Sequence, residues 1–237
     1  MIIFDAERLS DSPFVERIWC SHSEGAGTFL SVAESRWEMV VTRLQGKINL
    51  IVRGPETRAT SVECPADGKW LGIRFKLGTC MPHLPASNLV DGTVTLPEAT
   101  GQSFWLHGSA WQFPDYDNAD TFVGRLVREG LLVREPVVDA ALQGQLQDLS
   151  LRTAQRRFLQ TAGLTHSAAR QIERARYATV LLRQGASISD VVYEAGYFDQ
   201  PHLTRALKHF IGQTPAQIMG KSRSEQLSFL YKTIPFC

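Results

Sequence analysis

The sequence predicts a two-domain α+β protein in which an antiparallel β sandwich or small barrel precedes an all-α domain. Short apolar runs separated by glycine and proline fill residues 17–75, whereas helical periodicity with regular glycine stops dominates after Pro136. Charge divides the chain in the same way. Residues 1–149 hold 13 Lys and Arg against 19 Asp and Glu, and residues 150–223 hold 11 against 4. The acidic and basic halves are therefore expected to have different functions.

These patterns predict four segments. Residues 1–118 form the β-rich domain, residues 119–135 a linker helix, residues 136–221 the helical domain and residues 222–237 a tail. The linker is predicted because apolar residues recur near helical spacing over residues 121–132, with charged residues between them.

In the first half, apolar runs predict strands at residues 39–44, 48–52 and 71–75. Gln45, Gly46 and Lys47 separate the first two runs and place a glycine where a hairpin turn needs one.

In the second half, periodicity and helix-stop residues predict six helices, at residues 136–146, 151–162, 167–183, 189–195, 200–210 and 215–219. Ser150, either Ser187 or Ser189, and Asp199 are placed to cap helices at their N-termini. Pro201 follows at an early helical position, where its missing N–H costs little.

The helix at residues 151–162 carries polar and basic side chains on one face. Arg152, Gln155 and Arg156 share this face through their i, i+3, i+4 spacing. Arginine pairs with guanine through two hydrogen bonds, and glutamine pairs with adenine in the same way. These three residues are therefore candidates for contacts to DNA bases.

The helix at residues 200–210 repeats the arrangement, with Gln200, His202 and Arg205 leading on the polar side. In a helix-turn-helix, the second helix enters the major groove with residues near its start at the base edges. These three residues are the second set of candidates for base contacts. Phosphate contacts are expected from five further side chains, namely Arg157, Thr153, Thr204, Lys208 and His209.

Each of these side chains also has an ordinary explanation, since arginine and glutamine are good helix formers on any solvated face. The repetition of the pattern and the separate positive charge of residues 150–223 favour DNA, because a basic domain gains affinity by releasing counterions from phosphates.

Residues 149–219 resemble the double helix-turn-helix DNA-binding domain of the AraC/XylS family of transcriptional regulators. Residues 188–197 match the family's brace helix and turn, and residues 203–215 match its second recognition helix and closing Gly-x-Thr-Pro. One departure concerns the first half, because residues 136–149 have room for about one helix where the family has two. Gly144 also weakens that helix. Either the helix at residues 121–132 takes over part of the bracing, or the first recognition helix mainly contacts phosphate instead of bases.

The first half resembles, in texture and position, the cupin-like effector or oligomerisation domains that accompany this DNA-binding domain. Aromatic side chains there either line a pocket for an apolar or aromatic effector or build a core, and the pocket candidates are Trp37, Trp70, Phe75 and Trp105. Residues 81–85 form either a lid over such a pocket or an ordinary proline-stiffened loop.

No metal site or cofactor is expected. Cys20, His22 and Glu24 lie far from His83 and His107 in the sequence, and the four cysteines form no Cys-x-x-Cys pair. An enzyme is not expected either, because no cysteine has the basic or histidine-paired surroundings that alkyl transfer requires.

The resemblance implies a sequence-specific DNA-binding regulator, commonly an activator, that reads successive major grooves and is controlled by a small-molecule effector. Its expected partners are double-stranded DNA, the unidentified effector, RNA polymerase and a second copy of the chain, but no membrane. A cytoplasmic location is predicted, because the first ten residues show no secretion signal. Two alternatives stay open: a DNA-targeted cupin enzyme or alkyltransferase, and an architectural DNA-binding protein without an effector.

Overall fold

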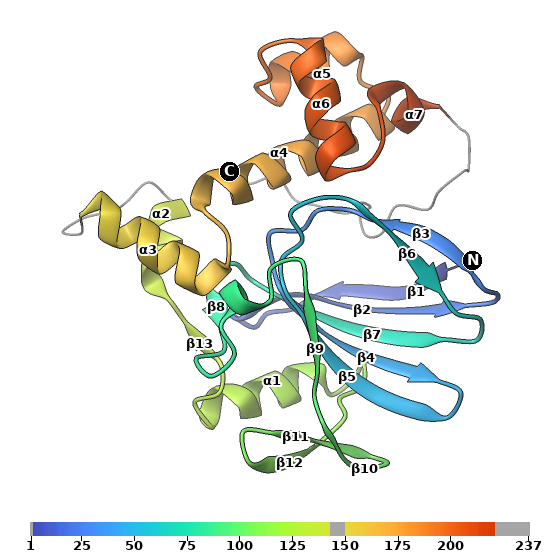
Figure 1. The fold of residues 1–237 in the computed structure, drawn as a ribbon, viewed down its shortest axis with the longest axis vertical. Coiled ribbons are helices and arrows are strands. Elements are labelled where there is room, and N and C mark those ends of the chain that lie inside the picture. Colours follow the sequence, from blue (N-terminus) through green and yellow to red (C-terminus); the bar gives the residue numbers. More distant parts are fainter. Residues whose placement is uncertain (1, 143–149, 221–237) are drawn as a thin grey trace. The chain divides into compact units, whose positions relative to one another are not determined.

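The computed structural model of the protein describes residues 2–142 and 150–220 (Figure 1). Over these residues, a part rich in antiparallel β-sheet is followed by a helical part. The predicted α+β class is therefore confirmed.

The chain divides by its internal contacts into two compact units, each assembled from separate segments. The first unit comprises Met1–Gly27, Arg36–Pro55 and Cys64–His166, and the second comprises Thr28–Ser35, Glu56–Glu63 and Ser167–Cys237. The predicted boundaries at residues 118, 135 and 221 stay a prediction.

A six-stranded sheet forms the framework of the first unit, with strand order β1-β2-β7-β4-β5-β9 and antiparallel pairing throughout. The strands are β1 (Ile2–Leu9), β2 (Val15–Ser23), β7 (Lys69–Phe75), β4 (Glu38–Leu44), β5 (Lys47–Arg53) and β9 (Thr93–Thr95). Leu44 pairs with Lys47, which leaves a two-residue turn of Gln45 (φ 49°) and Gly46 (φ 76°). Positive φ at both positions is typical of a type I′ hairpin, so the predicted turn is confirmed.

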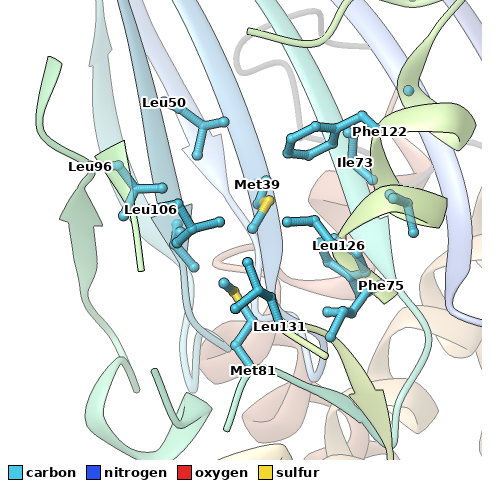
Figure 2. Close-up of a cluster of buried hydrophobic side chains, with 14 of the residues drawn as sticks. Met39, Leu50, Ile73, Phe75, Met81, Leu96, Leu106, Phe122, Leu126 and Leu131 are labelled. Atoms are coloured by element: carbon cyan, nitrogen blue, oxygen red, sulfur yellow. The ribbon is translucent and has the colours of Figure 1, made fainter. Parts of the chain in front are cut away.

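The core of the first unit lies between this sheet and helix α1 (Ala119–Arg128). Figure 2 shows Met39, Leu50 and Ile73 of the sheet facing Phe122 and Leu126 of the helix. A second sheet of three short strands contributes further core residues; its strands are β10 (Glu98–Thr100), β11 (Ser103–Leu106) and β12 (Ser109–Gln112). Helix α1 is therefore an integral part of the sheet unit.

Helix α3 (Leu151–Ala162) belongs to the first unit. It contacts α2 (Pro136–Leu142), the short 3-10 helix η1 (Ala86–Asn88) and β8 (Thr79–Cys80), which pairs with β13 (Val133–Arg134). The end of α3 is packed so closely on η1 that a Cβ on Gly163 would lie 2.8 Å from the Ala86 carbonyl oxygen. Gly163 also has a φ of 75°, and both facts favour glycine there.

The described part of the second unit contains four helices and a two-stranded β-ribbon. The helices are α4 (His166–Arg183), α5 (Ile188–Glu194), α6 (Gln200–Phe210) and α7 (Pro215–Met219), and the ribbon strands are β3 (Gly27–Ser31) and β6 (Thr60–Cys64). Leu30 and Val32 from the ribbon segment share one apolar cluster with residues of the helices, including Leu182, Leu203 and Leu207.

The segments Thr28–Ser35 and Glu56–Glu63, called the ribbon below, hold the end of α6. The backbone N–H of Ala33 donates to the Phe210 carbonyl at 2.8 Å, and that of Ala59 donates to the His209 carbonyl at 3.0 Å. Carbonyls at a helix C-terminus have no partner inside the helix, so the ribbon supplies the missing donors.

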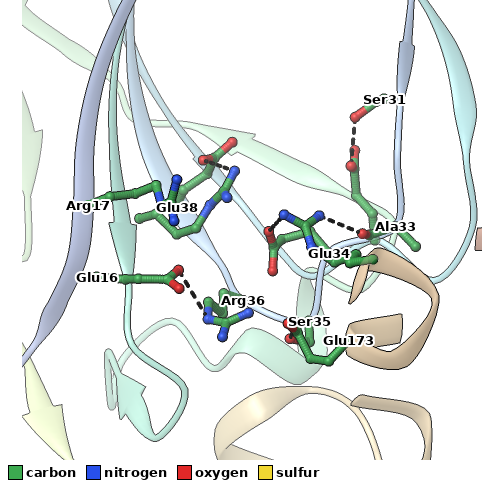
Figure 3. A network of polar contacts seen from close by, with 12 residues as sticks. Glu16, Arg17, Ser31, Ala33, Glu34, Ser35, Arg36, Glu38 and Glu173 are labelled. Carbon is green, nitrogen blue, oxygen red and sulfur yellow. Dashed lines mark hydrogen bonds and ion pairs between the residues drawn. The ribbon is translucent and has the colours of Figure 1, made fainter. Parts of the chain in front are cut away.

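A buried ion pair ties the ribbon to α4. Arg176 is 1% exposed, its Nη1 donates to the Ala33 carbonyl at 3.0 Å, and its Nη2 lies 3.2 Å from Oε2 of Glu34 (Figure 3). The Ser35 hydroxyl donates to Glu173 at 2.6 Å on the same helix. The ribbon and the helices are therefore joined by polar contacts as well as by the apolar cluster.

The predicted helices agree closely with the structure, and those at residues 151–162, 200–210 and 215–219 are confirmed at both ends. The helices predicted to begin at 167 and 189 begin one residue earlier, and Ser187 rather than Ser189 is the N-cap. Two predicted bounds differ by more, because the helix predicted at 121–132 spans 119–128 and Gly130 takes a φ of 69° beyond its end. The helix predicted at 136–146 is observed over 136–142, and its predicted end lies outside the described residues, as does Gly144.

Candidate nucleic-acid interface

Helix α6 is fixed at its start by its own sequence. The Asp199 carboxylate accepts the backbone N–H of His202 at 2.6 Å, and Pro201 occupies the first turn. Leu203 and Leu207 are fully buried and hold the helix on the second unit. The opposite side of α6 is consequently directed to solvent.

The solvent face of α6 carries the predicted contact residues. Gln200, Arg205, Lys208 and His209 are exposed, and Thr204 is half-buried. Arg205, Lys208 and His209 are spaced i, i+3, i+4 and so share one face. Within the described residues, neither Arg205 nor Lys208 takes part in an ion pair, so both charges are available to an anionic partner.

His202 has a different setting from the other candidates on α6. It is half-buried, its ring meets the Tyr197 ring edge-on at 5.2 Å, and its Nδ1 accepts the backbone N–H of Phe198 at 3.5 Å. Part of its role is therefore to hold the turn that precedes the helix.

Arg174 on α4 supports the same turn, which sequence reasoning missed. Its guanidinium lies 4.4 Å from the centre of the Tyr197 ring and donates to the Gly196 carbonyl at 3.3 Å. Burial raises the pKa of the Tyr197 phenol, and the neighbouring Arg174 acts in the opposite direction. A tyrosine at this position in a helix-turn-helix gives a weak sequence signal, but no pattern pairs it with an arginine on another helix.

Helix α3 presents the other predicted group. Ser150 caps it by accepting the backbone N–H of Thr153 at 3.2 Å, and the two hydroxyls lie 2.9 Å apart. Arg152, Gln155 and Arg156 are all exposed on this helix. The structure therefore brings these three residues together on a solvated surface. Thr153 is half-buried and already engaged in the cap.

Arg157 differs from its neighbours on α3. It is exposed, but its Nη1 lies 3.7 Å from Oε1 of Glu135. An exposed pair of this kind contributes little to stability, and a phosphate could replace the carboxylate as partner.

The two candidate helices belong to different compact units, α3 to the first and α6 to the second, with the division in the first turn of α4. Each unit brings together its own three predicted base-contacting residues. The individual base and phosphate contacts stay predictions.

Comparison with known proteins supports this assembly of helices. Residues 147–221 match the family described as a helix-turn-helix domain. This stretch is an AraC-type helix-turn-helix domain. The family resemblance seen in the sequence is thereby confirmed for the domain.

The chain is also similar to the HTH-type transcriptional regulator RipA of Corynebacterium glutamicum, to which it is 35% identical over 88 residues. The matched stretch is 36% of this chain and 27% of the relative, so the match spans about a quarter of that protein. No solved structure matches the chain significantly. Among the residues described, no helix is long and apolar enough to cross a membrane.

Outside the AraC-type domain, the four aromatic residues predicted for an effector pocket do not gather at one cavity. Trp37 and Phe75 stack at 4.0 Å between ring centres inside the core, and Trp105 is 46% exposed. Trp70 lines a cleft in the first unit, and the other three residues do not line that cleft. Sequence cannot separate a core tryptophan from one beside a cavity, because both are placed by tertiary packing.

The cleft has a volume of about 450 Å³ and opens beside β2, β7 and β4. It is lined by Asp5, Cys20, Ser21, His22, Val41, Arg43, Lys69, Trp70, Leu71, Pro114, Asp115 and Tyr116. His22, Lys69 and Arg43 are direct neighbours across these three strands and therefore form one row on one face of the sheet. Asp5 pairs with His22 at 2.7 Å, whereas no ion pair of Lys69 or Arg43 is found in the described structure.

The cysteines described show no nucleophilic setting. Burial, and secondarily Asp5, raises the pKa of the Cys20 thiol, and burial raises that of Cys80. Cys64 is buried, and Cys237 lies outside the described residues. Across residues 2–142 and 150–220, no three His, Cys, Asp or Glu side chains are grouped as metal ligands.

Proposed function

We propose that the protein is a sequence-specific DNA-binding transcription regulator of the AraC type, which reads successive major grooves with α3 and α6. The observation that carries the proposal is α6 within the matched domain: a capped helix with its apolar side buried and Gln200, Arg205 and Lys208 exposed. A helix in this position of a helix-turn-helix lies in the major groove.

Two substitutions on α6 distinguish base contacts from phosphate contacts. Arg205→Ala should remove discrimination between bases at one position, at a cost of about 1 to 3 kcal/mol on the preferred site. Lys208→Ala, its matched control, should weaken all duplexes alike and reduce the salt dependence by about one phosphate contact. An Arg205→Ala protein with unchanged preference for the selected site would contradict the role of α6.

The proposal as a whole is tested by selecting bound sequences from random duplex DNA with the purified full chain, followed by salt titration of the winning site. Two enriched elements about one helical turn apart are expected if both helices read bases. A single element would assign base reading to α6 alone and phosphate binding to α3. Failure to enrich any sequence, with and without candidate effectors, would favour an architectural DNA-binding protein.

The cleft in the first unit is the proposed effector site, with Trp70 retained from the predicted aromatic set. Trp37 and Phe75 are assigned to the core, and Trp105 to the exposed surface. Lys69 and Arg43 lie directly opposite each other across adjacent strands, an unfavourable placement for like charges unless an anion offsets it. The proposed effector is therefore a small organic acid. A panel of small carboxylic acids and their amides should raise the melting temperature selectively for the acids, and Lys69→Gln should abolish the difference.

The remaining partners follow from the same proposal. The regulator acts in the cytoplasm without cofactor or enzymatic activity, and its activation of transcription involves RNA polymerase. A second copy of the chain pairs through the sheet-containing unit. Sedimentation of the full chain with and without its selected duplex tests the pairing.

A further inference from the structure

Phe198 is the most exposed large apolar side chain in the described part of the chain, at 90%. The next is Tyr193 at 87%, which lies in α5, whereas Phe198 lies in the turn between α5 and α6. Single exposed apolar residues are common on protein surfaces, so exposure alone does not distinguish Phe198 from Tyr193. Phe198 differs from Tyr193 in its place, because it immediately precedes Asp199, the N-cap of α6.

The backbone at Phe198 is held on both sides. Tyr197 before it is buried beneath the Arg174 guanidinium, and Asp199 after it caps α6. The Phe198 N–H itself donates to His202 at 3.5 Å. The ring therefore projects from a fixed point immediately before the first turn of α6, which lowers the entropy lost when it makes a contact.

The chemistry around this ring favours duplex DNA over a protein as partner. Gln200 and Arg205 follow on the exposed side of the same helix, and residues at the start of such a helix reach the base edges. The apolar feature in the major groove is the C5-methyl group of thymine, which phenylalanine contacts. Resting on the proposed function, we infer that Phe198 is a specificity-determining residue that selects thymine by contacting its methyl group.

The test uses the full chain and the duplex that it selects from random DNA, with each thymine in turn replaced by deoxyuridine, which lacks only the methyl group. At one thymine the wild-type protein should lose about four-fold in affinity, the equivalent of one buried methyl group. Phe198→Ala should bind the thymine and deoxyuridine duplexes equally, and Phe198→Leu should restore part of the difference. Tyr193→Ala, the matched control, should keep the wild-type difference.

The outcomes separate this inference from the proposed function. If the protein selects a sequence but shows no methyl effect that depends on Phe198, the inference is wrong and the proposed function stands. The ring would then be assigned to a protein partner. No sequence selection at all overturns both. Circular dichroism of each variant verifies the fold, and the Arg205→Ala protein should retain the methyl effect because that side chain reads a different base.

Discussion

Removing the charge of Arg176 should destabilise the second unit strongly. The guanidinium is 1% exposed, donates to the Ala33 carbonyl at 3.0 Å and lies 3.2 Å from a Glu34 carboxylate that is 9% exposed. In Arg176→Met the stem keeps its packing, but the buried Glu34 carboxylate loses its contact with this cation. Breaking a buried pair in this way costs about 3 to 5 kcal/mol, out of a total stability of roughly 5 to 15 kcal/mol.

Urea unfolding is the assay, with helical circular dichroism and tryptophan fluorescence as separate probes. All five tryptophans lie in the first unit, so fluorescence reports that unit, while α4–α7 contribute only to the helical signal. With an m value of about 2 kcal/mol per M, the helical midpoint should fall by about 1.5 to 2.5 M. A helical transition that precedes the fluorescence transition would place the loss in the second unit.

Two controls make the result interpretable. Arg170→Met removes an exposed arginine from the same helix and should change stability by no more than about 0.5 kcal/mol. The double variant Arg176→Met with Glu34→Gln should recover part of the loss, because it also removes the buried negative charge that faced Arg176. A single variant no less stable than Arg170→Met would refute the reasoning.

Two further predictions concern the first unit. Phe158 lies on α3 and is 1% exposed, so Phe158→Ala leaves a cavity and should lower the free energy of unfolding in urea by about 3 to 5 kcal/mol. A decrease below about 1 kcal/mol would mean that this side chain does not hold α3 in place. Partial burial and the neighbouring His107 lower the pKa of His83 from its ordinary 6.5, so the unfolded chain binds more protons below that pH and stability should fall on acidification. His83→Gln should lose less stability than wild type between pH 6.5 and about pH 5 in unfolding titrations, and equal losses would contradict the assignment.

The helical half was predictable because its signals are local. Asp199 accepts the N–H of a residue three positions later, and Gly163 ends α3 through its own φ of 75°. Such signals lie within one turn of the element that they define, and short-range physical chemistry is sufficient to interpret them. The exposed positions of Arg152 and Arg205 followed from the same periodicity.

The β-rich half was less predictable because short strands carry little periodicity. Strands of three or four residues, such as β9, β10 and β12, hold too few positions to show alternation, and β1 has mostly exposed side chains. The ribbon was missed for the same reason. Its strands acquire their role only by packing on helices more than a hundred residues later, which no local pattern can encode.

Arg176 illustrates the limit most clearly. An arginine within a helix ordinarily lies on the solvated surface, yet this one is buried against Ala33, 143 residues earlier in the chain. Its burial depends on Glu34 being delivered to the same place by the ribbon. Pairing across such a separation in the sequence depends on the whole fold. The exposure of Phe198 likewise could not be predicted from hydrophobicity patterns alone.

The ribbon also bears on how DNA reading should be measured. The predicted helical domain, residues 136–221, excludes both ribbon segments, which supply two hydrogen bonds to the end of α6 and the carboxylate partner of Arg176. Each lost hydrogen bond removes about 0.5 to 1.5 kcal/mol, and the buried guanidinium loses its counter-charge as well. An excised helical domain that failed to bind DNA would therefore report the loss of these supports and leave the base contacts of α6 untested. The full chain, in which the recognition helix keeps both ends fixed, is the form in which sequence reading can be judged.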